Sequence, residues 1–114
     1  QALAENKNIV LVFSGSDWCA PCIKLDKTVW QSEEFKKESE TNWVIYKADF
    51  PKKKANQLSS TLTESNKLLA SKYNTSGNFP LVVLLDKNGI VLGMEGYKNF
   101  SASDYIKLIH SFEK

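Results

Sequence analysis

The chain has 114 residues, of which 42% are hydrophobic and 25% are charged, values typical of one folded domain over residues 1–114. Its formal net charge of +2 gives no compositional support for nucleic-acid binding. Two cysteines are too few for a disulfide-stapled scaffold, and no apolar run approaches the ~18 residues of a membrane span. Because the sequence begins at Gln1 and not at Met, we expect that an upstream segment has been removed.

The first third of the chain predicts a strand followed by a helix. Residues 1–6 resemble the end of a helix, and residues 9–14 are nearly all apolar and β-branched, as in a strand covered on both faces. After turn-forming residues at 14–17, a helix is expected to begin at Ala20 or Pro21. Proline is tolerated there because N–H groups in the first turn have no partner within the helix.

The middle of the chain predicts two helices around a second strand. Ser32 follows a break and can act as an N-cap for a helix over residues 33–39. Residues 43–48 form an apolar strand pattern. The polar residues 55–62 are ambiguous, and the spacing of leucines predicts a helix over 63–73.

The last third predicts a hairpin and a closing helix. Strands over 81–85 and 90–94 flank Asn88-Gly89, a strong signal for an antiparallel hairpin turn. Ser101 resembles the start of a capping box for an amphipathic helix over 102–112. The predicted order is therefore β-α-β-α-β-β-α, with a parallel first pair and an antiparallel last pair. This α/β order predicts a central mixed four-stranded sheet flanked by helices on both faces.

The only two cysteines lie in Trp18-Cys19-Ala20-Pro21-Cys22, between the first predicted strand and the helix that follows it. Disulfide exchange needs a thiolate, and a free thiol with a pKa near 8.5 supplies little of it at neutral pH. Cys19, just before the helix, faces the positive end of the helix dipole and is predicted to attack. Cys22, one turn inside, is predicted to be less exposed and to resolve the mixed disulfide.

Two nearby cysteines also allow other interpretations. The pair could be a structural disulfide or two buried thiols. A zinc site would need further ligands, and only His110 could be a third; we expect this histidine at the solvated surface. Two such pairs from a dimer could also hold a metal or an iron–sulfur cluster.

A strand, Trp-Cys-x-Pro-Cys at a helix start, Phe79-Pro80 before a later strand, a hairpin and a final helix together resemble the thioredoxin superfamily. The resemblance covers residues 9–112. Asp49-Phe50-Pro51 and the lead-in from Phe13 to Trp18 are similar to a bacterial subgroup near the thioredoxin-like domains of periplasmic disulfide reductases. The resemblance implies a thioredoxin-like fold whose sheet has four strands, or five if residues 1–6 retain part of another.

The resemblance also implies a substrate site. It places a cis bond before Pro80 beside the dithiol, so that the Phe79 backbone can pair with an extended substrate peptide. Gly96 is expected to line the same groove and Trp18 its rim, and Ala20 and Pro21 complete the predicted substrate-binding set. No cofactor or metal is implied, because the Cys19–Cys22 pair is itself the redox group.

One position departs from the family pattern. Thioredoxins usually carry a buried acid six residues before the first cysteine, where it assists proton transfer at the resolving thiol. Here that position is Phe13. Three other groups are candidates for the role: Asp17, Lys47 and Glu95.

The predicted function is that of a thiol–disulfide oxidoreductase, most simply a reductase of protein disulfides. Its partners would be protein substrates with disulfides or mixed disulfides and an upstream or downstream thiol-redox protein, with the chain acting as a monomer in the bacterial periplasm, or alternatively in the cytoplasm. An isomerase, an oxidant, and a binding or adaptor module with an inert disulfide are alternatives. Residues 52–54, all lysine, are expected to form a solvated loop, whereas Phe50 and Phe100 are candidates for protein contact.

Overall fold

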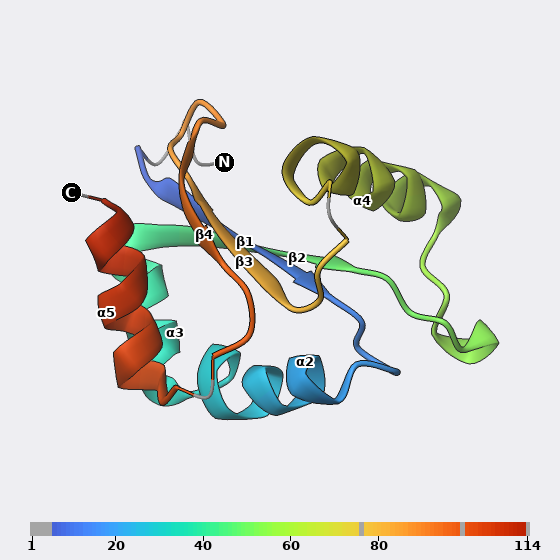
Figure 1. Cartoon of the computed structure of the whole chain (residues 1–114), viewed down its shortest axis with the longest axis horizontal. Helices are drawn as coiled ribbons and strands as arrows, with labels where there is room; N and C mark the ends of the chain where they lie inside the picture. Colours follow the sequence, from blue (N-terminus) through green and yellow to red (C-terminus); the bar gives the residue numbers. More distant parts are fainter. Residues whose placement is uncertain (1–5, 76, 99, 114) are drawn as a thin grey trace.

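The computed structural model describes residues 6–75, 77–98 and 100–113, and its elements follow the predicted order (Figure 1). The strands are β1 (Asn8–Ser14), β2 (Trp43–Asp49), β3 (Leu81–Leu85) and β4 (Val91–Glu95). The α-helices are α2 (Ala20–Leu25), α3 (Glu33–Asn42), α4 (Ser60–Tyr73) and α5 (Ala102–Phe112). A π-helical segment, η1 (Asp26–Trp30), continues α2, and a 3-10 turn, η2 (Lys54–Asn56), precedes α4. The helix expected over residues 1–6 lies almost wholly outside the described residues.

The sheet confirms the mixed arrangement predicted from the sequence. Its strand order is β2-β1-β3-β4. β1 pairs in parallel with β2, and β3 runs antiparallel to both β1 and β4. Within the described ranges the sheet has four strands and not five.

Helices cover both faces of the sheet (Figure 1). On one face, Val10 and Val12 pack in a core with residues of α2, η1, α3 and α5. On the other face, Leu11 and Phe13 pack in a second core with residues of α4. Residues 10–13 are all buried, which explains why this strand is apolar at consecutive positions and does not alternate.

The structure corrects some predicted boundaries. Helix α4 begins at Ser60 and not at 63, because the Ser59 hydroxyl caps it by accepting a hydrogen bond from Leu62 N–H at 3.2 Å. Strand β4 begins at Val91, one residue later than predicted, because Ile90 N–H donates to the Asp86 carboxylate and so belongs to the hairpin turn. The caps at Ser32 and Ser101 are confirmed.

In the parts of the chain that the structure describes, no helix combines the length and apolarity that crossing a membrane requires.

Candidate active site

The two cysteines form a disulfide at the start of α2. Cys19 is the N-cap residue and Cys22 lies in the first turn, with their Cα atoms 5.2 Å apart. The backbone N–H of Cys22 donates a hydrogen bond to Cys19 Sγ at 3.4 Å. Such a donor at a helix start stabilises negative charge on the sulfur once the bond is reduced. Cys19 is 6% exposed and Cys22 2%, so the order of exposure matches the prediction.

Trp18, which directly precedes Cys19, packs against residues of two other loops. Its indole N–H donates to the carbonyl of Phe50 at 2.7 Å, and its ring forms a T-shaped contact with Phe79 at a centroid distance of 5.4 Å. The ring passes so close to Gly15 that a Cβ there would lie 2.2 Å from it. Glycine is therefore required at position 15 for the indole to adopt this position.

The Phe79–Pro80 peptide bond is cis, as the family resemblance implies. Phe79 contacts both Trp18 and Phe50, with centroid distances of 5.4 and 5.5 Å. These contacts bring the loop before β3 next to the cysteine motif. Gly96 directly follows β4, whose last residue pairs with Val82 of β3, and a Cβ at Gly96 would meet open space.

The three proton-transfer candidates lie in different places. Asp17 faces residues 52–56, where its carboxylate accepts hydrogen bonds from the backbone N–H groups of Lys52 and Lys53. Glu95 forms an ion pair with Lys98 at 3.8 Å. Lys47 alone of the three lines a cavity that also reaches Cys22.

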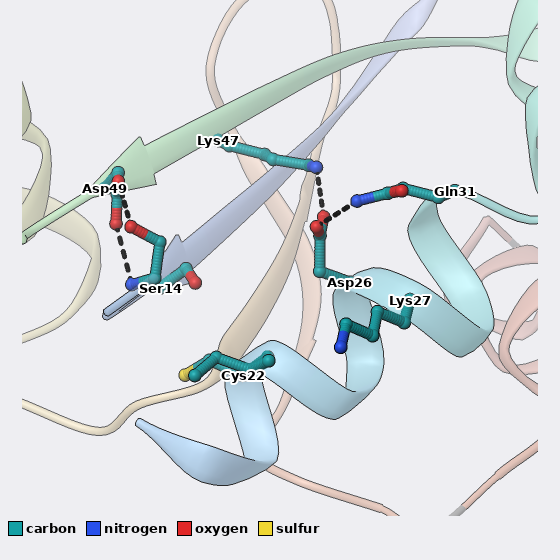
Figure 2. A pocket seen from close by; sticks show the side chains of 9 residues that line it. Ser14, Cys22, Asp26, Lys27, Gln31, Lys47 and Asp49 are labelled. Atoms are coloured by element: carbon teal, nitrogen blue, oxygen red, sulfur yellow. Dashed lines mark hydrogen bonds and ion pairs between the residues drawn. The ribbon is translucent and has the colours of Figure 1, made fainter. Parts of the chain in front are cut away.

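This cavity has a volume of about 340 Å³ and lies between α2 and the carboxyl ends of β1 and β2 (Figure 2). Its lining includes Cys22, Asp26, Lys47 and Asp49. The strand register explains its polar wall, because Lys47 and Asp49 pair with Val12 and Ser14 and so share the face that α2 covers.

No group of three or more histidine, cysteine, aspartate or glutamate side chains in the described residues is arranged to hold a metal ion. His110, considered from the sequence as a third zinc ligand beside the two cysteines, lies on α5. It contacts Glu38 and Glu113 at 2.9 and 2.7 Å and packs on the ring of Trp43. The histidine therefore lies at the surface, as expected, with 40% of its side chain exposed, and polar partners hold it there.

A family model described as a thioredoxin-like domain matches residues 1–112. The chain belongs to the thioredoxin-like family. Its thioredoxin-like fold places a cysteine pair at the start of a helix next to a cis-proline loop.

Two curated relatives come from Chlamydia pneumoniae. Disulfide bond reductase DsbH is 33% identical over 107 residues, which cover 94% of this chain and 63% of that protein. Thioredoxin-related protein DsbJ is 30% identical over 89 residues, which cover 75% of this chain and 25% of that protein. The thioredoxin-like chain therefore spans less than two thirds of the length of either relative.

A solved structure described as DsbH oxidoreductase superposes on this thioredoxin-like chain with a TM-score of 0.88 at 32% identity. The match covers 97% of this chain and 75% of the other. A disulphide isomerase from Xylella fastidiosa Temecula1 has a TM-score of 0.69 at 16% identity, a level that shows the fold alone. It covers 99% of this chain and 83% of the other.

Sequence reasoning missed one residue of this thioredoxin-like site. Asp26 lines the cavity with Cys22, and its carboxylate accepts hydrogen bonds from the Lys47 ammonium and the Gln31 amide (Figure 2). The signal was present, because residues four apart on a helix share a face and Asp26 is the fourth residue after Cys22.

Proposed function

We propose that the chain is a thiol–disulfide oxidoreductase that reduces disulfides of protein substrates. The observation that carries this proposal is the Cys19–Cys22 disulfide at the start of α2, with a backbone N–H directed at Cys19 Sγ. An inert structural disulfide would need neither this donor nor an aromatic loop beside it. The name of the relative DsbH, a disulfide bond reductase, favours the reductive direction.

In the proposed reaction, the Cys19 thiolate attacks one sulfur of a substrate disulfide. The other substrate sulfur leaves with the bonding electron pair and takes up a proton. The thiolate of Cys22 then attacks Cys19 Sγ, which forms the Cys19–Cys22 disulfide and releases the second substrate thiol. The substrate gains two electrons, the cysteine pair loses two, and a thiol-redox partner must reduce the pair again.

The substrate would lie across the rim of the motif. Ala20 and Pro21 are exposed at the start of α2, and Trp18 is 39% exposed. An extended peptide would pair with the Phe79 backbone before the cis bond to Pro80 and pass over Gly96, where no side chain stands in its way. The half-buried ring of Phe50 would border the same groove.

The cysteine pair would be the only redox group, and no cofactor or metal is part of the proposal. We propose a monomer acting in the periplasm of a bacterium, with disulfide-bonded proteins as substrates. The Dsb names of the relatives support a thiol-redox partnership of this kind.

Trapping on a defined substrate tests the proposal. Cys22→Ala should accumulate a disulfide-linked adduct with insulin through Cys19, whereas Cys19→Ala should form none. The unaltered chain should reduce insulin in the presence of dithiothreitol. Failure of both cysteine variants to form an adduct, together with no insulin reduction, would indicate an adaptor module with an inert disulfide.

A further inference from the structure

Cys22 cannot act as the second nucleophile until its thiol has lost a proton. The sulfur belongs to a residue that is only 2% exposed, so bulk water has little access to it. The position that carries the family's acid holds Phe13, which is 0% exposed and packed in an apolar core. A proton acceptor must therefore reach Cys22 from elsewhere.

The cavity described above offers a route to Cys22. Two carboxylates line it, Asp26 on the helical side and Asp49 on β2. Lys27 and Lys47 are the other charged groups on its wall among the described residues. A cavity of about 340 Å³ with several polar partners has room for water molecules that can relay a proton.

Both carboxylate oxygens of Asp49 are hydrogen-bonded to Ser16. Its two oxygens accept hydrogen bonds from the backbone N–H of Ser16 at 3.0 Å and from the Ser16 hydroxyl at 2.5 Å. These bonds fix the turn that leads into the cysteine motif. Asp49 also lies on the strand side of the cavity, across from Cys22 (Figure 2).

Asp26 lies on the same helical stretch as Cys22, one turn further along. The Lys47 ammonium and the Gln31 amide hold its two oxygens. The π-helical segment makes the second contact possible, because Gln31 N–H bonds to the Asp26 carbonyl at 2.9 Å, five residues back, and places Gln31 beside the acid. π-Turns of this kind often occur at functional sites.

We propose that Asp26 accepts the proton of Cys22, through water in the cavity, when Cys22 resolves the mixed disulfide; this inference rests on the proposed function. The carboxylate takes the thiol proton, the Cys22 thiolate attacks Cys19 Sγ, and the bond between Cys19 and the substrate sulfur breaks. The electron pair leaves on the substrate thiolate. Lys47 and Gln31 are positioning residues that keep the carboxylate in the cavity.

Stopped-flow reaction of the reduced chain with 5,5′-dithiobis(2-nitrobenzoate) separates the two steps. Attack by Cys19 releases the first thionitrobenzoate, and attack by Cys22 on the resulting mixed disulfide releases the second. Asp26→Asn should slow the second release on the order of 10²-fold at pH ~7 and leave the first within about twofold. The difference in the second rate between Asp26→Asn and the unaltered chain should shrink above pH ~9, because hydroxide can then deprotonate the Cys22 thiol without Asp26.

Rescue experiments distinguish proton transfer from structural damage. Asp26→Glu should recover most of the second rate, and formate should partly restore it in Asp26→Ala, whereas equal concentrations of chloride should not. Glu64→Gln removes an exposed carboxylate of α4 and should change neither rate. Asp49→Asn should slow the second release less than Asp26→Asn does.

The inference fails if Asp26→Asn leaves the second release within about threefold of the unaltered rate across the pH range, or if only Asp49→Asn slows it. Absence of the first release in the unaltered chain would instead overturn the proposed function. The two failures are therefore distinguishable in one experiment.

Discussion

Lys47 of β2 and Asp26 of the π-helical segment η1 form an ion pair across the cavity that reaches Cys22. The pair joins the sheet to the helix that carries the cysteines. Its side chains are 43% and 33% exposed, so it contributes little to stability. Its importance should therefore lie in positioning the carboxylate.

Replacing Lys47 with methionine tests this role. Lys47→Met keeps Asp26 but removes the cation that holds it. We expect a loss of less than about 1 kcal/mol in the free energy of unfolding, together with a second thionitrobenzoate release that slows by less than in Asp26→Asn. Urea denaturation and stopped flow measure the two effects. A first release that slows as much as the second would contradict a role limited to Cys22.

Asp17 fastens the loop beside Trp18. Its carboxylate accepts bonds from Lys52 N–H at 2.9 Å and from Lys53 N–H and the Asn56 amide at 3.0 Å. Led by the Lys52 hydrogen bond, these donors lower the pKa of Asp17 below its ordinary value. Asp17→Ala should therefore speed trypsin cleavage within residues 52–54 several-fold, whereas Glu64→Ala should not. Equal cleavage rates in all three proteins would show that the loop is held by other contacts.

His110 should make stability depend on pH. Burial alone would lower the pKa of His110, but its hydrogen bonds with Glu38 and Glu113 outweigh burial and raise it above 6.5. Burial would raise the pKa of Glu113, yet bonds from Asn8, His110 and Trp43 lower it below 4.5.

The direction of each pKa shift decides over which pH range the group stabilises the fold. Stabilisation from a raised histidine pKa is complete below pH 6.5 and is lost as the pH rises through the folded-state pKa. Stabilisation from a lowered glutamate pKa is lost as the pH falls through its folded-state value. His110→Gln should thus lower Tm by about 2 to 4 °C near pH ~5.5, and by less at pH ~8.5. Lys107→Gln, on the same helix, should show no such pH dependence; a constant deficit in His110→Gln would contradict the assignment.

Tyr105 anchors the segment that follows Gly96. The tyrosine is fully buried, and its hydroxyl donates to the Lys98 carbonyl at 2.7 Å and accepts from Lys98 N–H at 2.9 Å. Tyr105→Phe leaves both backbone groups without these partners and should cost about 1–3 kcal/mol in the free energy of unfolding. Urea denaturation with an unchanged m-value would confirm a purely native-state effect. A cost below about 0.5 kcal/mol would mean that water replaces the hydroxyl.

Local sequence signals predicted most of the fold. The apolar run at 9–14, the Ser32 and Ser101 caps and the Asn88-Gly89 turn each act over a few residues, and the structure confirms all of them. The start of α4 was harder to predict, because Ser59 and Ser60 are equally plausible caps and the residues around them are polar.

The site was only partly predictable. The cysteine pair, Trp18 and the cis Phe79–Pro80 bond follow from a short motif and a family resemblance. Its spacing from Cys22 places Asp26 on the same helix face, but its contacts with Lys47 and Gln31 depend on a cavity between α2 and β2 and on a π-turn, which the spacing alone does not predict. The polar contacts of His110 could not be predicted for a similar reason, because its partner Glu38 lies on a different helix, 72 residues away.

The reduction potential of the Cys19–Cys22 pair tests the central claim most directly. Equilibration with defined ratios of reduced and oxidised dithiothreitol or glutathione, followed by thiol alkylation, gives this value. A reductase should have a potential at or below about −230 mV, toward the value of about −270 mV for thioredoxin. A potential above about −180 mV would contradict the account and indicate an isomerase or an oxidant.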